Sequence, residues 1–448
     1  MKKITSYILF SFILLTGCKK TEMLIDGEKP EIRVTEALKA YTDTLTKSTY
    51  GWKATLYPGK YTSKDPYEEL LYNIGYSFYI SFNDKNRVTM YSDLSTGTAV
   101  SSAESSYGIK SMQNLILYFD TFGIIPTLQS GSPLFDLDFK VDKIIGDTIK
   151  LTGQISNSKL VLIKATKVEQ SAYQSKGLLS IINATNAYID NNPVLYFPLA
   201  DGTKIQTKLE YAYKTISLAW VEDGVFKDAS TRFTYTSSGI LLKEPLMFRG
   251  KKLTELFLDP VKLVYFLKVD GVRIDLAPVT DSIFPLYLAI GNDYLSLNVP
   301  DKTTNPGWGN DFIIRRAKAA ASLIAIDFYT FRLGTMFFRF NAKEKTMILV
   351  CDVWTGPYRY QSGYYYTYSA TTAGVFKFNY TPIQPETNES TTAGFSGTGM
   401  DPITMERLAT DQFKIEYVTE PGTGVLLGQV TSVEHPDFTF NGALLKRL

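Results

Sequence analysis

The feature that most constrains this fold is a series of short segments in which apolar residues occupy every second position. Apolar residues alternate in this way from Tyr76 to Phe82 and again from Val88 to Met90, with a polar turn at Asn83–Asn86 between the two segments. Successive side chains of a strand point to opposite faces, so the pattern predicts antiparallel strands that bury one face. Further strand-like segments are Trp52–Tyr57, Leu115–Phe119, Leu137–Val141, Ile149–Leu151 and Leu160–Leu162.

A meander of such strands exposes two edges unless it closes on itself. We therefore predict a mainly β protein of tandem antiparallel meander domains, barrel-like or sandwich-like, with a few helices. One helix is expected from Val34 to Leu45, where apolar residues recur at helical spacing, and Gly51 can end it. A second is expected around Ala172–Asp190, before a helix-breaking Asn-Asn-Pro sequence. We place a domain boundary there, between an N-terminal domain at 31–190 and a C-terminal β-rich domain at 191–448.

The second half of the chain restarts as strands. Asp-Gly pairs, the strongest short-range hairpin signal, separate apolar runs at 201–202, 223–224 and 270–271. A weaker helix is expected at Phe312–Leu323, which is rich in alanine. The segment Phe337–Asn341 echoes Tyr79–Asn83, with a charged turn and a Thr-Met strand after each. This echo hints at two related β units.

The N-terminus reads as an export signal. Two lysines precede the mostly apolar run Ile4–Leu15, which is shorter than the roughly 20 residues that span a bilayer. The run ends in Leu15-Thr16-Gly17-Cys18, which resembles the lipobox of bacterial lipoproteins. We predict a signal peptide at 1–17, a lipid on Cys18 that holds the protein on a membrane, and a tether at 18–30. The alternative is an ordinary cleaved signal followed by a chance cysteine.

Composition excludes several classes of site. Without the two signal-peptide lysines, basic and acidic residues are equal in number, which argues against nucleic acid as a partner. After Cys18 only Cys351 remains, in an apolar run typical of a buried thiol, so no internal disulfide can form. His435 is the single histidine, so zinc sites with several histidines are impossible. It precedes Pro-Asp and is expected on an exposed turn. We expect no cofactor and no metal, and we assign no catalytic residue.

The densest feature is an aromatic stretch in which Gly356, Pro357 and Gly363 suggest a loop rather than an uninterrupted strand. We predict that Trp354, Tyr358, Tyr360, Tyr364 and Tyr366 form an exposed surface that binds a glycan or peptide ligand. Flat aromatic faces stack on sugar rings and on peptide side chains, and phenol groups add hydrogen bonds. Strand alternation would place the last two tyrosines on one face. The alternative is a tyrosine-rich strand pair packed in the core.

Paired carboxylates offer a rival chemistry. Asp136 and Asp138 are expected to project from one face of a strand and could act in glycoside hydrolysis or bind Ca²⁺. The plainer interpretation is that both are solvated charges on a strand face. Asp93 and Asp120 each close a strand, where turn or cap duty is the simpler expectation.

Several short motifs resemble a family of Bacteroidota lipoproteins, domain-of-unknown-function family 4302. The likeness is best in the first half, and its motifs are Gly51-Trp52-Lys53, Phe82 with Val88-Thr89-Met90 and Asp93, Ser105-Ser106-Tyr107, Leu117–Phe122 and Asp136-Leu137-Asp138-Phe139. The resemblance implies a companion of outer-membrane uptake systems of the starch-utilisation type, and it brings no catalytic residues.

We therefore expect an outer-membrane lipoprotein, facing the cell surface rather than the periplasm, that captures a ligand without catalysis beside a transporter complex. The alternatives are a structural lipoprotein that contacts only protein partners and a carboxylate-dependent hydrolase.

Overall fold

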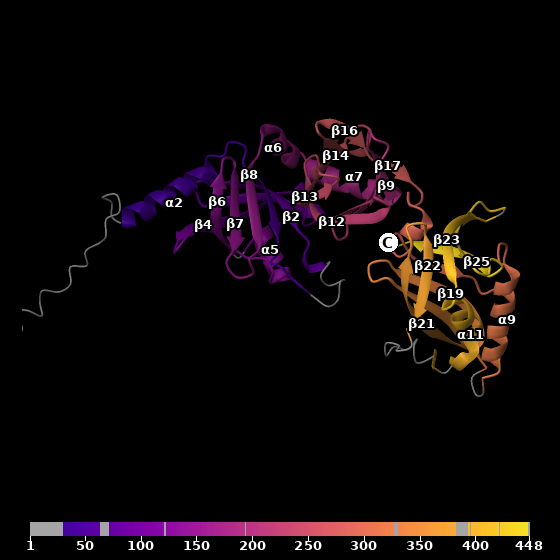
Figure 1. Ribbon diagram of the computed structural model, residues 1–448. Coiled ribbons are helices and arrows are strands. Elements are labelled where there is room, and N and C mark those ends of the chain that lie inside the picture. The colour runs from indigo at the N-terminus through magenta and orange to yellow at the C-terminus, as the bar shows by residue number, and fades with distance from the viewer. Residues whose placement is uncertain are drawn as a thin grey trace, which may run out of the picture. The chain divides into compact units, whose positions relative to one another are not determined.

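The computed structural model describes residues 30–62, 71–120, 122–192, 194–326, 330–381, 393–394, 396–420 and 422–446. The predicted signal peptide, Cys18 and nearly all of the predicted tether lie outside these residues. Mainly antiparallel strands make up the described chain, in two closed barrels and a nine-stranded sheet (Figure 1). The predicted fold class is therefore confirmed.

The first barrel is a meander of eight strands in sequence order. It closes where β1 pairs with β8, with Trp52 opposite Lys164. Helix α2 (Pro30–Thr46) precedes it, and the indole nitrogen of Trp52 donates to the Leu45 carbonyl (2.9 Å). The strands are β1 Trp52–Tyr57, β2 Tyr76–Phe82, β3 Arg87–Ser92, β4 Ala103–Ser111, β5 Leu115–Phe119, β6 Asp138–Ile145, β7 Thr148–Gly153 and β8 Lys159–Lys164, with short helices α4 Thr96–Val100 and α5 Ile124–Gly131.

The alternating residues of the sequence fill this barrel. Phe78, Ile80 and Phe82 of β2 are buried beside Val88 and Met90 of β3. The predicted closure into a barrel is thus observed, and it leaves neither β1 nor β8 as an unpaired edge.

The nine-stranded sheet has the order β16-β15-β14-β13-β12-β11-β10-β9-β17. The predicted helix before it is two helices, because Lys176 adopts a left-handed conformation (φ 65°) between them. At 223–224 and 270–271 both turn residues have positive φ, as the hairpin signal predicts. The elements are α6 Lys167–Gln174, α7 Gly177–Asn191, β9 Val194–Pro198, β10 Lys204–Glu210, β11 Thr215–Glu222, β12 Val225–Thr236, β13 Gly239–Phe248, β14 Lys251–Asp259, β15 Val264–Val269, β16 Val272–Asp275 and β17 Ala277–Val279.

The second barrel is again an eight-stranded meander, closed by pairing of β18 with β25. The predicted helix is α9 (Asn310–Ile324), which lies along this barrel in Figure 1 and buries Phe312, Ala319 and Leu323 in its core. The strands are β18 Tyr294–Val299, β19 Arg332–Asn341, β20 Thr346–Thr355, β21 Tyr358–Ala370, β22 Val375–Tyr380, β23 Gln412–Thr419, β24 Leu426–Ser432 and β25 Thr439–Lys446, with α8 Leu286–Ala289, η1 Gly397–Met400, α11 Asp401–Ile403 and η2 Thr404–Leu408.

The two echoing segments occupy the same place in their barrels. Tyr79–Asn83 ends β2 and Phe337–Asn341 ends β19, the second strand of each meander. In both turns the asparagine side chain accepts backbone N–H groups: Asn83 from Lys85 and Arg87, and Asn341 from Lys343 and Glu344. The echoing sequences therefore form the same kind of asparagine-capped turn after the second strand of each barrel.

Contacts divide the chain into two compact units. The first comprises the described parts of Met1–Pro193, Lys208–Ser217 and Ala229–Leu276, and the second those of Val194–Thr207, Leu218–Asp228 and Ala277–Leu448. Each unit therefore holds one barrel and part of the nine-stranded sheet. The boundary placed between residues 190 and 191 stays a prediction about independent folding.

Candidate functional site

The predicted aromatic stretch forms the hairpin of β20 and β21. Thr355 pairs with Tyr358, and Gly356-Pro357 makes a two-residue turn in which Gly356 has φ 55°. Gly363, which we expected in a loop, lies within β21 opposite Val350. The two strands are therefore continuous, and alternation decides which side chains face outward.

Two of the five predicted binding residues are in the core. Tyr364 and Tyr366 are only 5% and 1% exposed, and they pack inside the second barrel. Burial raises the pKa of both phenols well above its usual value. The Tyr366 hydroxyl donates to the Thr404 carbonyl (3.2 Å). The expectation that these two residues are exposed is wrong, because an uninterrupted strand turns every second side chain into the barrel.

The other three predicted residues lie toward the hairpin tip. Tyr358 is 66% exposed and Tyr360 is 44% exposed, while Trp354 is partly exposed. The Tyr360 ring meets Phe331 edge-on at 6.4 Å between centroids. The predicted exposure therefore holds for Tyr358 and Tyr360 and only in part for Trp354, and ligand binding by these residues stays a prediction.

A glycine makes room for the Trp354 indole. A Cβ at Gly334 of β19 would lie 3.0 Å from the indole nitrogen and 3.0 Å from the Cβ of Asp352. These contacts are tighter than side chains normally make, so the absence of a side chain at residue 334 lets the edge of the indole approach the β19 backbone. The indole is thus held by the barrel wall rather than by a loop.

Strand register places a guanidinium on each side of this indole. Arg332 of β19 and Arg359 of β21 are the direct partners of Trp354 on the neighbouring strands. The Arg332 guanidinium lies over the indole, 5.7 Å from its centroid, a cation–π contact. We call Arg332, Trp354 and Arg359 the arginine–tryptophan row.

Two aspartates hold the arginines of the row. Asp352, buried on β20, accepts hydrogen bonds from Arg359 (2.8 Å) and from the Gln361 amide (3.1 Å). Asp301 forms an ion pair with Arg332 (2.6 Å). Sequence reasoning missed both Arg332 and Asp301 because they are far from Trp354 along the chain. The β19–β20 register, which the sequence did not define, places Arg332 beside Trp354, and Asp301, in the loop after β18, pairs with that arginine.

The predicted carboxylate pair is not a pair in space. Asp136 precedes β6 and is buried, and its oxygens accept the backbone N–H groups of Ile155, Ser156 and Ser158 and the Ser158 hydroxyl, at 2.6–3.1 Å. Asp138 forms an ion pair with Lys110 (2.5 Å). The expectation that both project from one strand face is therefore wrong, since Asp136 turns inward to hold the 155–158 loop.

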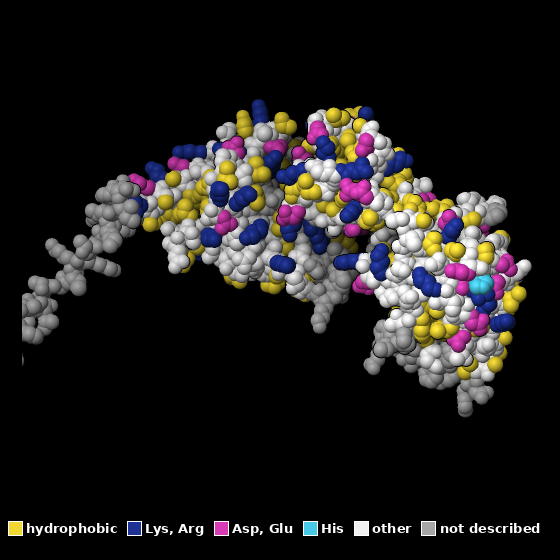
Figure 2. Space-filling view, viewed as in Figure 1, with side chains coloured by type: hydrophobic (Ala, Val, Ile, Leu, Met, Phe, Trp, Pro, Cys, Tyr) yellow, Lys and Arg dark blue, Asp and Glu magenta, His cyan; other side chains and the backbone are white. Residues whose placement is uncertain are grey.

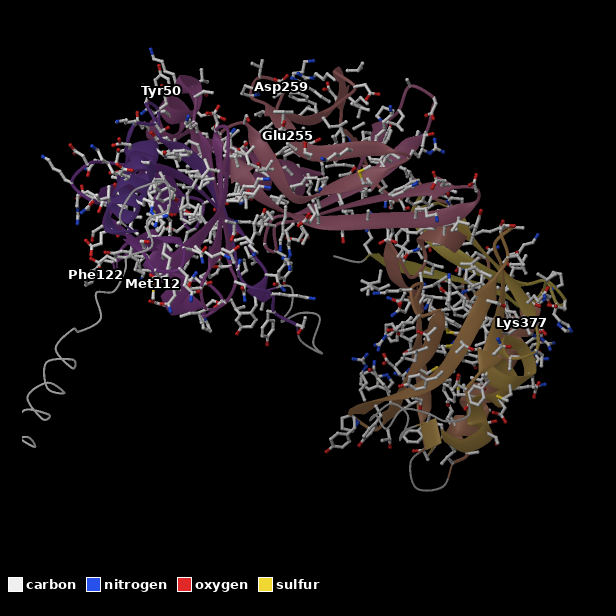
Figure 3. All side chains as sticks on the ribbon, turned by 60° about the vertical axis from the view of Figure 1, so that its left-hand side comes forward. Tyr50, Met112, Phe122, Glu255, Asp259 and Lys377 are labelled. Atoms are coloured by element: carbon white, nitrogen blue, oxygen red, sulfur yellow. The ribbon has the colours of Figure 1, made fainter. Side chains whose placement is uncertain are left out.

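Carboxylates on β14 offer no better acid–base pair. Figure 3 labels Glu255 and Asp259, both on this strand. Backbone N–H groups of Lys262 and Val261 and the Arg273 guanidinium lower the pKa of Asp259 to about 2. A carboxyl this acidic stays ionised near neutral pH and cannot serve there as a general acid. Among the described residues, no cluster of His, Cys, Asp or Glu has the arrangement of a metal site.

The single histidine is exposed, as predicted, on the surface of the second barrel beside acidic and basic side chains (Figure 2). Its Nδ1 lies 2.9 Å from the buried Asp411 carboxylate, which also accepts the Ser432 hydroxyl (2.7 Å). Both contacts fix the turn that leads into β25. The histidine therefore has a structural role in the described part of the chain.

A buried ion pair explains another motif residue. Asp93 accepts the backbone N–H of Ser77 (2.8 Å) and pairs with Lys214 (2.8 Å), and both charged side chains are buried. The Lys214 ammonium also donates to the Gly75 carbonyl (3.0 Å) and lies 4.4 Å from the centroid of the Tyr76 ring. Asp93 thus does more than close a strand, since it anchors a lysine of the β10–β11 turn to the first barrel.

Comparison with known protein families gives one match, which covers the motifs of the first half of the chain. The family model described as "Domain of unknown function (DUF4302)" matches residues 27–260, just over half of the chain. Among curated proteins, none matches the chain. None of the described helices combines the length and hydropathy that crossing a bilayer requires.

Similarity to solved structures is slight. Transferrin binding protein B from Neisseria meningitidis is 9% identical with a TM-score of 0.12, and the match covers 88% of this chain and 76% of that one. The DNA polymerase sliding clamp of Pseudomonas aeruginosa is 10% identical with a TM-score of 0.11, with 92% and 96% covered. TM-scores this low support no conclusion about function.

Proposed function

This chain belongs to the DUF4302 family, and from that premise we propose that it is a lipid-anchored protein of the cell envelope that captures a saccharide at the tip of the β20–β21 hairpin. The observation that carries the proposal is the setting of Trp354: a partly exposed indole held against the strand of Gly334 and flanked by two guanidinium groups.

The chemistry of the tip suits a sugar ring. A flat indole stacks on the apolar face of a pyranose, and such contacts contribute about 0.5–1.5 kcal/mol each beyond the burial of area. Ring hydroxyls need both donors and acceptors beside that face. On the face of the hairpin that carries Trp354, the side chains of Arg332, Arg359 and Gln361 supply donors. Tyr358 and Tyr360 lie on the opposite face, so their phenol groups can contact only a part of the ligand that extends past the tip.

The test is retention of the purified protein on glycan and peptide arrays. The variant Trp354→Ala should bind its glycan about two- to tenfold more weakly, from the loss of one stacking contact. Tyr50→Ala, at an exposed tyrosine in the turn before β1, is the matched control and should bind normally. Circular dichroism checks that each variant folds. Retention of peptides alone, or of nothing, would favour a protein-contacting lipoprotein instead.

Anchoring at the membrane follows from the N-terminal sequence. A lipid on Cys18 would hold the protein at the outer membrane, where we place it on the cell surface beside a transporter complex. Cys18→Ser should abolish labelling by radioactive fatty acid and release the protein from membranes. Cys351→Ala removes the other cysteine, which is buried, and should leave labelling unchanged. Labelling that survives in Cys18→Ser would refute the anchor.

The face of the membrane needs its own measurement. Proteinase added to intact cells should degrade the folded units if the protein is on the surface. Degradation that begins only after lysis would place the protein on the periplasmic side.

A further inference from the structure

We infer that the saccharide captured at the hairpin tip is acidic, and that its carboxylate or sulfate binds Arg332 beside the Trp354 indole. The inference rests on the proposed function and names the chemical class of its ligand. Its basis is the arrangement and the imbalance of charges around the arginine–tryptophan row.

The strand register places guanidinium groups next to the proposed sugar site. Because Arg332 and Arg359 are the cross-strand partners of Trp354, a sugar stacked on the indole has a guanidinium beside it on either strand. The planar fork of a guanidinium matches the two oxygens of a carboxylate or sulfate, and such charge-assisted bonds are the strong ones. An anionic substituent on the sugar ring can therefore accept hydrogen bonds from a guanidinium on the strand next to Trp354.

The charges on the two sides of the row differ. Among the described residues, Arg359 is the one cation that forms an ion pair with Asp352, which leaves that side neutral. Asp301 forms ion pairs with two guanidinium groups, those of Arg332 at 2.6 Å and of Arg316 on α9 at 3.9 Å. One carboxylate against two cations leaves an excess positive charge at the Arg332 side.

The surroundings of Arg316 support this excess of positive charge. Its side chain is buried, one of its amino groups donates to the Gly334 carbonyl (3.0 Å), and its Nε is buried without a hydrogen-bond partner among the described residues. Burial lowers the pKa of this guanidinium, and Asp301 opposes that shift. Among the described residues, Asp301 is the carboxylate paired with this buried cation, and Asp301 also pairs with Arg332, so the local charge favours the approach of a second anion.

The Arg332 guanidinium is accessible to a ligand. The Arg332 side chain is 56% exposed, although it is already paired with Asp301. A guanidinium has five N–H groups, so donors remain for a ligand after this ion pair is made. Arg332 is thus the residue at which the excess charge reaches solvent.

The experiment compares glycans that differ only in charge. The full chain is offered polygalacturonate and its methyl ester, and chondroitin sulfate and its desulfated form, within an array of other acidic and neutral glycans. We expect retention of at least one acidic glycan about tenfold above its neutral counterpart, weakened by added salt. The uronate and sulfate arms identify the anion, and preference in either arm supports the inference.

Variants separate this inference from the proposed function. Arg332→Gln should reduce the preference for the acidic glycan over its neutral form about tenfold, whereas Arg332→Lys should keep part of the preference. Arg87→Gln, an exposed arginine paired with Glu104 at 2.7 Å on the first barrel, is the matched control.

Equal binding of acidic and neutral forms by the parent protein, or an equal loss of both in Arg332→Gln, would overturn the acidic class and leave saccharide capture standing. Retention of no glycan, or retention that Trp354→Ala does not weaken, would overturn saccharide capture and the acidic class together.

Discussion

Asp136 illustrates how a single buried carboxylate can hold a turn. Four donors from residues 155–158 converge on its two oxygens, and each oxygen accepts two of them. A Cβ at Gly153 would lie only 1.9 Å from its Oδ2, so the neighbouring glycine is required as well. The motif that includes Asp136 therefore encodes a fixed turn of the first barrel, which is a reason for its presence that needs no catalysis.

Replacement of this carboxylate should be costly. Asp136→Asn puts an amide group where Oδ2 or Oδ1 now accepts two donors, so at least one backbone N–H loses its partner. We expect the free energy of unfolding to fall by about 1–3 kcal/mol. Urea unfolding followed by circular dichroism measures this loss. Asp147→Asn, at an exposed carboxylate paired with Lys164, should change stability by less than about 1 kcal/mol. Equal effects of the two changes would refute the role given to Asp136.

Gly334 makes a second residue-scale prediction. Gly334→Ala adds a Cβ within 3.0 Å of the Trp354 indole nitrogen, so the ring must move away from the strand. Trp354 emission should shift to longer wavelength, and glycan binding should weaken while the barrel stays folded. An unchanged emission spectrum would show that the indole does not depend on Gly334 for its position.

Among the elements, the β20–β21 hairpin combines two functions that the sequence does not separate. Tyr358, Tyr360, Tyr364 and Tyr366 share one face of β21. Tyr364 and Tyr366 lie inside the barrel and build its core, while Tyr358 and Tyr360 at the tip remain exposed. Composition alone marked all of them as a surface. Gly363 suggested a loop, and only the pairing of β20 with β21 reveals a continuous strand.

Local patterns explain which other elements could be predicted. Strands with strict alternation, such as β1 and β2, have the expected bounds. Strand β4, Ala103–Ser111, was missed because its small and polar residues do not alternate clearly, although its backbone pairs with β3 and β5. The arginine–tryptophan row depends on register between strands, which no local pattern defines. Site residues close in sequence to Trp354 were therefore found, and Arg332 and Asp301 were not.

At the scale of the whole molecule, buried charge ties the first barrel to strands of the nine-stranded sheet within one unit. The family match spans both Asp93 and Lys214, which lie far apart in sequence and form one ion pair. Both side chains leave water, so neither charge has an alternative partner as good.

A double-mutant cycle measures the coupling. Asp93→Asn or Lys214→Met alone should lower the free energy of unfolding by about 3–5 kcal/mol, because each change leaves the other charge buried without its partner. The double variant should lose much less than the sum of the two. The exposed pair Lys251–Asp270 is the control, with an expected coupling of about 1 kcal/mol or less. Additive losses at Asp93 and Lys214 would mean that the buried pair is not energetically linked.

The central claim, that the hairpin tip captures a saccharide on Trp354, is tested most directly by the accessibility of this one indole. The chain has four tryptophans, and Trp52, Trp220 and Trp308 are buried, so acrylamide quenching in the folded protein reports mainly on Trp354. Addition of the glycan retained on the array should protect its emission from acrylamide in a saturable way, with the same midpoint as binding. A glycan that binds at saturation while quenching of Trp354 stays unchanged would contradict the account.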